Sequence, residues 1–234
     1  MRIPARLLAR TSACLFTGLL AVTSLDCAAV AFAVRIGLER VNLDTPPGFS
    51  DTTDLASPRL QDLAATLTSA SNRVVIFALS DADVRKFTQG DPVEARRYAV
   101  VVTPKGLERQ RVTADQFNTL VADALRDFGK PSTPPDLTKF LEKQPIGRVQ
   151  LLEELRKETT IVSVLQGTRL PPLTGRAFQD NKEQFMFFST TIILVAGKAL
   201  QLGVYSLYDS PTDIEWVKSI TLRWIEELLR LNPR

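Results

Sequence analysis

Two runs of consecutive apolar residues constrain the fold of this chain more than any other feature of its sequence. Residues 74–79 (VVIFAL) and 98–102 (YAVVV) contain no charged residue and show no apolar–polar alternation. A strand with this pattern has to be covered on both of its faces, because a bare face would expose apolar surface to water. We therefore expect both runs to form central strands of a sheet that carries helices on its two sides.

The other strong strand signals occur as pairs of neighbouring segments. Residues 185–195 and 199–207 are predicted to form a hairpin with Gly197-Lys198 at its tip. Residues 148–155 fit either a helix or a strand, and we favour a strand paired with the β-branched segment 159–166. Strands joined by hairpins run antiparallel. The predicted fold class is therefore α+β, a three-layer α/β/α sandwich with a largely antiparallel central sheet.

Capping residues and apolar spacing predict three main helices. Their starts are expected at Ser57-Pro58, at Thr113 and at Ser210-Pro211. A serine or threonine N-cap is favourable at each start, and proline suits the first helical position because its missing N–H has no partner there. Gln116 and Asp213 follow their N-caps by three residues, as a capping box requires.

The sequence also predicts the structure of two shorter segments and the position of one tryptophan. Residues 34–44 alternate apolar and polar residues with a one-residue slip, a pattern typical of one half-buried strand. Residues 81–97 are polar and are predicted to be a long hairpin connection. Trp216 lies off the apolar stripe of the last helix, and we expect it to be exposed at an edge.

The N-terminal segment has the order of features found in a secretory signal. Met1–Arg10 carries three arginines and no acid, an uncharged apolar run follows, and Ala31-Phe32-Ala33 has small residues at the spacing of a cleavage site. We expect cleavage after Ala33, with Ala29 as the alternative. An uncleaved anchor is the competing interpretation, although Asp26 would be costly inside lipid.

Removal of this segment changes the chemistry of the chain. Both cysteines leave with it, the sequence contains no histidine, and the formal net charge falls from +3 to +1. Such a small charge gives no basis for nucleic-acid binding, which needs a clustered basic face. The mature chain then has no Ser-His-Asp or Cys-His arrangement, and it lacks the phosphate-binding and nucleophile-elbow motifs. We expect no cofactor.

Asp81 and Asp83 are candidate metal ligands. They directly follow the apolar run 74–79. Two acids separated by one residue can supply oxygen ligands to a divalent cation. The alternative is a solvated turn, in which aspartate is common.

Two arginine pairs are candidate contacts for an anion, a lipid headgroup or a partner protein. They are Arg96 with Arg97, and Arg109 with Arg111. The alternative interpretation is that these residues are strand-edge charges that oppose aggregation.

The element order and two local patterns resemble the PsbP-like superfamily. The first pattern is a strand that ends in residues 43–49 (LDTPPGF), and the second is a closing Gly-Lys hairpin followed by a long amphipathic helix. That superfamily includes photosystem accessory subunits and bacterial DcrB-type envelope proteins. The chain departs from the pattern through an apparent extra segment, 136–175. We divide the chain into a signal peptide or uncleaved anchor, 1–33, and a single PsbP-like α+β domain, 34–234.

The resemblance and the absence of catalytic motifs together favour a non-enzymatic periplasmic protein, a binding or assembly accessory with an envelope protein as its partner. Membrane contact is expected only through an uncleaved N-terminus. Two other functions stay open. One is a divalent-metal-dependent enzyme that uses Asp81 and Asp83, and the other is a membrane-tethered structural envelope protein.

Overall fold

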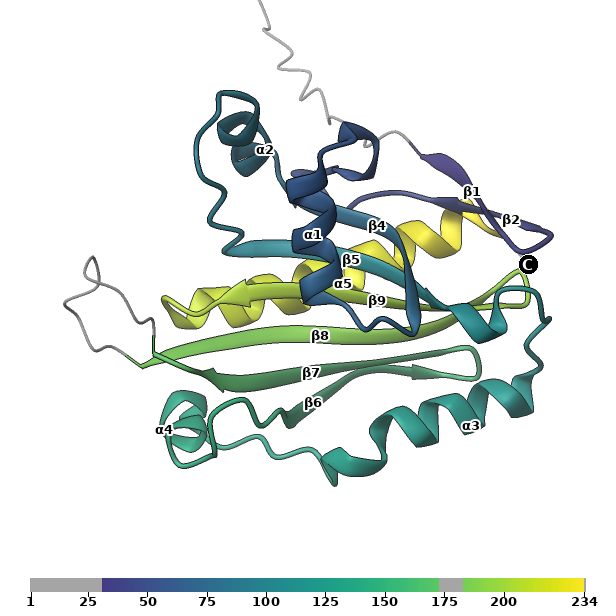
Figure 1. Cartoon of the computed structure of the whole chain (residues 1–234). Helices are drawn as coiled ribbons and strands as arrows, with labels where there is room; N and C mark the ends of the chain where they lie inside the picture. The colour runs from purple at the N-terminus through teal and green to yellow at the C-terminus, as the bar shows by residue number, and fades with distance from the viewer. Residues whose placement is uncertain (1–30, 173–182, 234) are drawn as a thin grey trace, which may run out of the picture.

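An antiparallel sheet of seven strands forms the centre of the molecule (Figure 1). The computed structural model describes residues 31–172 and 183–233. The strand order is β3-β4-β5-β9-β8-β7-β6, and every neighbouring pair runs antiparallel. The strands are β3 (Phe49–Asp51), β4 (Asn72–Ser80), β5 (Arg97–Pro104), β6 (Gln150–Glu158), β7 (Ile161–Leu170), β8 (Gln184–Val195) and β9 (Lys198–Leu207).

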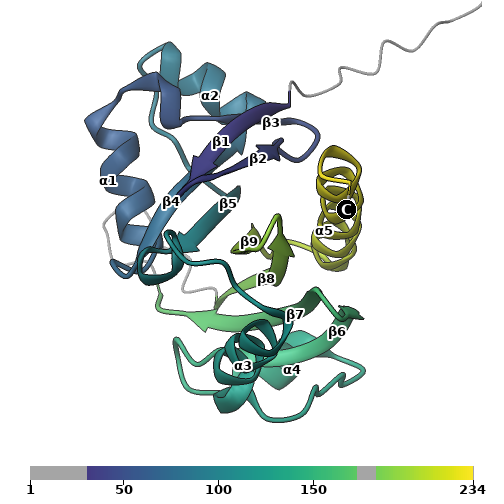
Figure 2. The ribbon, with the colours of Figure 1, turned by 90° about the vertical axis from the view of Figure 1, so that its right-hand side faces the viewer.

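Helices cover both faces of this sheet, which confirms the predicted α+β sandwich. The long helix α5 (Pro211–Leu231) and the short helix α4 (Leu137–Glu142) pack on one face. The helices α1 (Pro58–Leu67) and α3 (Ala114–Leu125) pack on the other face, and Figure 2 shows the sheet between α5 and α1. Short 3-10 turns lie at Thr53–Leu55, Lys105–Leu107 and Arg126–Phe128.

The two apolar runs form β4 and β5, which are neighbouring inner strands of the sheet, as predicted. In β4, Phe77 points into the core under α1, whereas its neighbour Ala78 belongs to the core under α5. In β5, Val100 and Val101 divide between the same two cores. Neither strand therefore has a solvent face, and this explains why their sequences do not alternate.

The segment 34–44 is a hairpin, so the prediction of a single strand is wrong. β1 (Phe32–Ile36) pairs antiparallel with β2 (Glu39–Leu43), and Gly37 and Leu38 form the turn. The apparent slip in the alternation is this turn. Gly37 has a φ of 61°, which glycine adopts at little cost. The buried side of the hairpin packs against α5, where the indole N–H of Trp224 donates to the carbonyl of Asp44.

The expected cleavage after Ala33 falls inside β1. Phe32 pairs with Leu43 and packs partly buried against the core, and Ala33 pairs with Asn42. Cleavage there would remove the first two residues of the strand, whereas cleavage after Ala29 would leave β1 whole. Residues 1–30, with the rest of the expected signal, lie outside the described residues.

The polar connection 81–97 contains a helix that the sequence did not indicate to us. α2 (Asp81–Thr88) begins directly after β4, and Ser80 is its N-cap. The Ser80 hydroxyl accepts a hydrogen bond from the backbone N–H of Asp83 and donates to the Asp83 carboxylate. This local capping arrangement stabilises a helix that has too few apolar residues to show a periodic pattern.

The remaining predicted elements are largely confirmed. The β8–β9 hairpin and the β6–β7 pair are present, but both turns are displaced from their predicted positions. The β8–β9 turn lies at 196–197 rather than at Gly197-Lys198, and the β6–β7 turn lies at 159–160 rather than between the predicted strands at 156–158. The capping boxes of α3 and α5 form as expected, whereas Ser57 makes no side-chain cap bond at the start of α1. Among the described residues, no helix combines the length and apolar character needed to cross a membrane.

Candidate functional site

Two adjoining hollows meet at Tyr208, at the end of the molecule where α5 begins. The first, of about 480 Å³, lies between residues 133–138, β6, β7 and the first turns of α5. The second, of about 420 Å³, lies beside the start of β8 and the residues that follow β9. Tyr208 and Thr138 line both hollows. We call the pair the Tyr208 groove.

The floor of the Tyr208 groove is apolar and rigidly supported. Leu152, Leu165 and Ile214 line the first hollow and Phe185 lines the second, and all four belong to one buried cluster. The ring of Tyr208 packs against this cluster, with its centroid 6.5 Å from that of Phe185. Such a floor can accept apolar parts of a ligand without rearrangement of the core.

The rim of the Tyr208 groove is acidic. Its cations among the described lining residues are Arg96 and Lys218. The described lining residues also include six carboxylates, which are Asp136, Glu142, Glu153, Glu183, Asp209 and Glu215. Carboxylates therefore outnumber cations among these lining residues. Lys139 and Arg169, which lie outside the lining, pair with Asp136 and Glu183 and offset part of this excess. The remaining excess favours cationic groups.

Both rim cations are already engaged with carboxylates. The ammonium of Lys218 lies 2.7 Å from Glu153 and 3.3 Å from Glu215. Burial disfavours the charged ammonium, but the hydrogen bonds to these two carboxylates outweigh burial and raise the pKa of Lys218. Arg96 forms an ion pair with Asp209 at 2.5 Å. Lys218 and Arg96 are consequently poorly available to an anionic ligand.

Asp136 and Tyr208 hold opposite protonation states in the groove. Asp136 is the N-cap of α4, where it accepts hydrogen bonds from the backbone N–H of Lys139 and from the Thr138 hydroxyl. These bonds lower the pKa of Asp136 to about 2. Burial, together with the charges of Asp136 and Asp213, raises the pKa of Tyr208. The phenol keeps its proton, and no described residue hydrogen-bonds to its hydroxyl, so it can donate to a ligand.

Arg97 joins the sheet to the start of α5 beside the groove. Its guanidinium donates to Asp213 at 2.6 Å and lies 4.3 Å from the ring centroid of Trp216. Trp216 is half-buried between Arg97 and Phe49, so the expectation of an exposed edge residue is wrong. The cation stacked on its ring covers this side of the indole and explains a position off the apolar stripe.

Asp213 has three hydrogen-bond donors at this junction. Besides Arg97, the backbone N–H groups of Asp209 and Ser210 each donate to its carboxylate at 2.9 Å. Burial alone would raise the pKa of Asp213, but the donors outweigh burial and lower it. The ionised carboxylate fixes the chain that leads from β9 into α5, and with it the position of Tyr208.

The candidate metal ligands lie elsewhere, in the first turn of α2. The carboxylate of Asp81 accepts a hydrogen bond from the Ser50 hydroxyl at 2.7 Å, and that of Asp83 is buried and held by Ser80. No group of three or more metal-ligating side chains occurs within 31–172 and 183–233. Metal binding by Asp81 and Asp83 stays a prediction, and the observed geometry is that of a helix start.

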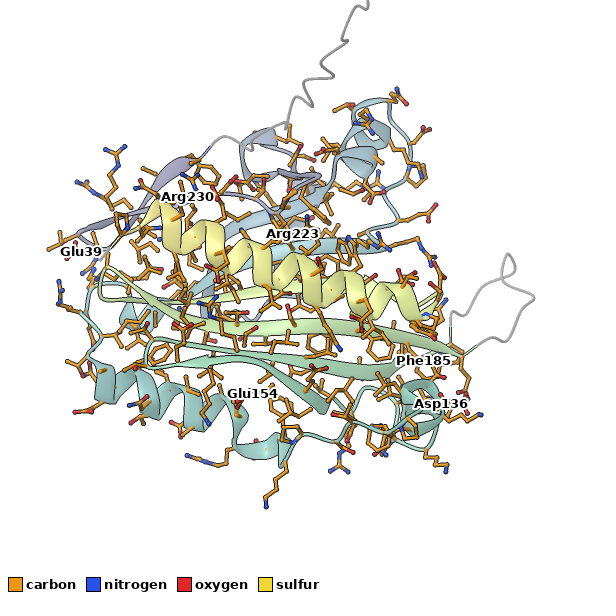
Figure 3. All side chains as sticks on the ribbon, turned by 180° about the vertical axis from the view of Figure 1, so that it is seen from behind. Glu39, Asp136, Glu154, Phe185, Arg223 and Arg230 are labelled. Carbon is orange, nitrogen blue, oxygen red and sulfur yellow. The ribbon has the colours of Figure 1, made fainter. Side chains whose placement is uncertain are left out.

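The four candidate arginines separate into two distant pairs. Arg96 lines the Tyr208 groove, and Arg97 lies beside it. Arg109 and Arg111 lie at the opposite end of the sheet, beside the β1–β2 turn, where Arg111 is 3.8 Å from Glu39. In Figure 3, Asp136 and Phe185 mark the groove end, and Glu39 marks the other end.

Little in the sequence indicates the groove itself. Tyr208 follows an apolar strand and Asp136 ends a proline-rich connection, and no motif links the two positions. Lys218 lies on the polar side of α5 and resembles any solvated helical lysine. The signal that could have identified them is tertiary, because α5 is remote in sequence from α4 and β6.

No family model matches this chain, and no curated protein matches it. Among solved structures, the chain is similar to the Ran-binding protein Mog1p of Saccharomyces cerevisiae, with 12% identity, a TM-score of 0.38, and coverage of 87% of this chain and 95% of that chain. A substituted form of the protein Mog1 gives 12% identity, a TM-score of 0.38, and coverage of 86% and 94%. Matches at this level assign no function to the chain, and the PsbP-like resemblance stays an expectation.

Proposed function

We propose that this protein is a non-enzymatic envelope accessory that binds a cationic segment of a partner protein in the Tyr208 groove. The observation that carries the proposal is the combination of an apolar floor with a rim on which carboxylates outnumber cations. The predicted signal segment supports a periplasmic location for this activity. An assembly or binding role is consistent with the resemblance that the sequence shows.

The groove offers separate partners to each part of such a segment. Aliphatic side chains can pack on Leu152, Leu165 and Ile214, which form the floor of the first hollow. Lysine or arginine side chains can pair with Glu142, which forms no ion pair among the described residues, and can compete for the paired rim carboxylates. Charge-assisted hydrogen bonds of this kind are stronger than neutral ones. The Tyr208 hydroxyl can donate to a backbone carbonyl of the bound segment.

The protonation states of three groove residues, Asp136, Lys218 and Tyr208, suit binding better than catalysis. A general base works best with a pKa near the working pH. Asp136, with a pKa of about 2, is too weak a base, and Lys218 and Tyr208 have raised pKa values that keep them protonated. The same states suit recognition, because they present fixed negative charge and a hydrogen-bond donor.

Site-specific photo-crosslinking in cells tests the proposal. A benzophenone side chain at Glu215, on the groove rim, is compared with one at Arg223, which is exposed on the same helix two turns further on (Figure 3). We expect an adduct from Glu215 only, with the crosslinked partner peptide rich in lysine and arginine. A second probe at Glu142 should capture the same peptide from the second hollow.

Reversing one charge on the groove rim gives a second test of the proposal. Glu142→Lys should reduce the adduct formed from the Glu215 probe severalfold, because it removes one carboxylate and adds a like charge against the cationic segment. An adduct that forms equally from Glu215 and Arg223, or that maps to an acidic partner peptide, would contradict the proposal.

A further inference from the structure

The end of the molecule opposite the Tyr208 groove carries an exposed leucine among arginines. Leu38, in the β1–β2 turn, is 90% exposed. Arg35 and Arg40 flank it on the two strands, and the loop that carries Arg109 and Arg111 contacts the turn. We call these five residues the basic tip.

Two arginines of the basic tip form an unfavourable pair in the protein alone. Arg35 and Arg40 are directly opposite each other in the β1–β2 register, and both are exposed. Like charges directly opposite in an antiparallel pair are destabilising. An anion between or above them would remove this repulsion.

Few acidic side chains near the basic tip are available to balance its positive charge. Glu108 is engaged by Arg73 at 3.0 Å, and Glu39 lies 3.8 Å from Arg111. No described residue forms an ion pair with Arg35, Arg40 or Arg109. The tip therefore presents a net positive surface with free guanidinium groups.

The loop beside the tip is held in place by a buried lysine. Lys198 is 3% exposed, and its ammonium donates to the carbonyl of Glu108 at 2.9 Å and to that of Gln110 at 2.7 Å. A β-carbon on Gly37 would lie 2.0 Å from the Glu108 carbonyl oxygen, so the turn and the loop are in direct contact. The backbone of Arg109 is thereby held beside Gly37 of the β1–β2 turn before any ligand arrives.

We propose that the basic tip docks on an anionic lipid surface, with Leu38 inserted at the headgroup boundary and the arginines bound to lipid phosphates. An apolar side chain surrounded by basic residues is the chemistry of interfacial membrane contact. Each basic residue near an anionic bilayer adds to the attraction. This departs from the sequence-based expectation, in which membrane contact occurs only through an uncleaved N-terminus.

Vesicle co-sedimentation tests the proposal with protein expressed from the full sequence and processed as the cell processes it. Vesicles of phosphatidylcholine alone are compared with vesicles that also contain phosphatidylglycerol. The difference between the two is the measured quantity, because a retained apolar N-terminus would bind both. We expect binding that requires phosphatidylglycerol and that falls steeply as salt is raised.

Paired variants separate the basic tip from general surface charge. The double variant Arg35→Gln with Arg40→Gln should weaken binding to phosphatidylglycerol vesicles by more than about tenfold. The reason is that the loss of each positive charge weakens binding by about fivefold. Leu38→Ser should weaken it by about fivefold. The matched controls are Arg59→Gln with Arg223→Gln, which removes the same charge elsewhere, and Ile146→Ser, which removes another exposed apolar side chain.

The proposal is overturned by equal binding to both vesicle compositions, by no binding to either, or by control variants that lose as much as the tip variants. Unchanged circular dichroism and thermal unfolding of each variant show that the fold is intact. If the basic tip serves an acidic protein instead, the vesicles give no binding, and the lipid proposal fails while the groove proposal is unaffected.

Discussion

Arg97 and Asp213 illustrate how one ion pair fixes the junction between two elements. The pair joins β5 to the start of α5, and the cation also lies against the ring of Trp216. Arginine suits this position better than lysine, because its planar group can stack on the indole and donate to the carboxylate at the same time. From the sequence, Arg97 is a candidate contact residue, whereas in the structure it positions the rim of the Tyr208 groove.

Asp213→Asn should lower stability at neutral pH and flatten its dependence on acid. The native pKa of Asp213 is lowered, so its contribution to the free energy of unfolding is complete above the unfolded pKa, which is near 3.8. That contribution is lost as the pH falls through the lower folded pKa. We expect the variant to lose about 1 to 2 kcal/mol at pH 7.

Urea unfolding between about pH 6 and about pH 2 measures both effects. The wild-type free energy of unfolding should decline in the acid part of this range by more than that of Asp213→Asn. Asp136 titrates in the same range and is present in both proteins, so the difference between them isolates Asp213. Parallel pH profiles would show that Asp213 adds nothing to acid sensitivity.

At the scale of elements, the helices and strands that a few adjacent residues specify were the ones predicted correctly from the sequence. The β8–β9 hairpin and the capping boxes of α3 and α5 were predicted because a few adjacent residues specify them. α2 was missed because its cap, Ser80, ends a strand, and because a short polar helix has no apolar period. The β1–β2 turn was missed because Leu38 continues the apolar pattern although its side chain faces solvent.

The candidate site was less predictable than the fold for a physical reason. The Tyr208 groove needs α4, β6 and the start of α5 together, and no short-range pattern reports such a meeting. Arg96 was identified as a contact candidate from its charge alone, and the structure places it on the groove rim. Lys218 could not be distinguished by sequence from other helical lysines.

The β1–β2 hairpin leads to a prediction about processing. A chain that begins after Ala33 lacks Phe32, which packs partly buried against the core and pairs with Leu43. Loss of this packing should cost about 1 to 2 kcal/mol of the free energy of unfolding relative to a chain that begins after Ala29. We therefore expect the intact mass of the exported protein to include Phe32.

Intact-mass measurement of protein recovered from the cell envelope checks this directly. A mass that corresponds to a start at Val34 would contradict the prediction. Urea unfolding of the two chains provides the second measurement, and equal midpoints would show that Phe32 contributes no stability.

At the scale of the whole molecule, the two proposed surfaces lie at opposite ends (Figure 3). The groove has an excess of carboxylates and the tip an excess of arginines. α5 connects them, because Ile214 and Lys218 near its start line the groove and Asn232 after its end bonds to Asn42 of β2. Sites this far apart with no shared contacts usually act independently.

Glu215→Lys, on the groove rim, should therefore leave binding to phosphatidylglycerol vesicles within about twofold of the wild type. Conversely, Arg35→Gln with Arg40→Gln should leave the adduct yield of the Glu142 probe unchanged in detergent extract, where no bilayer is present. A change of severalfold in either experiment would reveal coupling between the two ends.

The length of α5 also affects the electrostatic interaction between the groove and a bilayer. A helix of 21 residues extends about 30 Å. Counter-ions at physiological salt attenuate the interaction of exposed charges over about 8 Å. A carboxylate-rich cavity would be repelled by the phosphates of a bilayer if the two were close. The length of α5 therefore separates the groove from the basic tip by several screening lengths. One small protein can then carry a carboxylate-rich binding site for cations at one end and contact an anionic bilayer at the other.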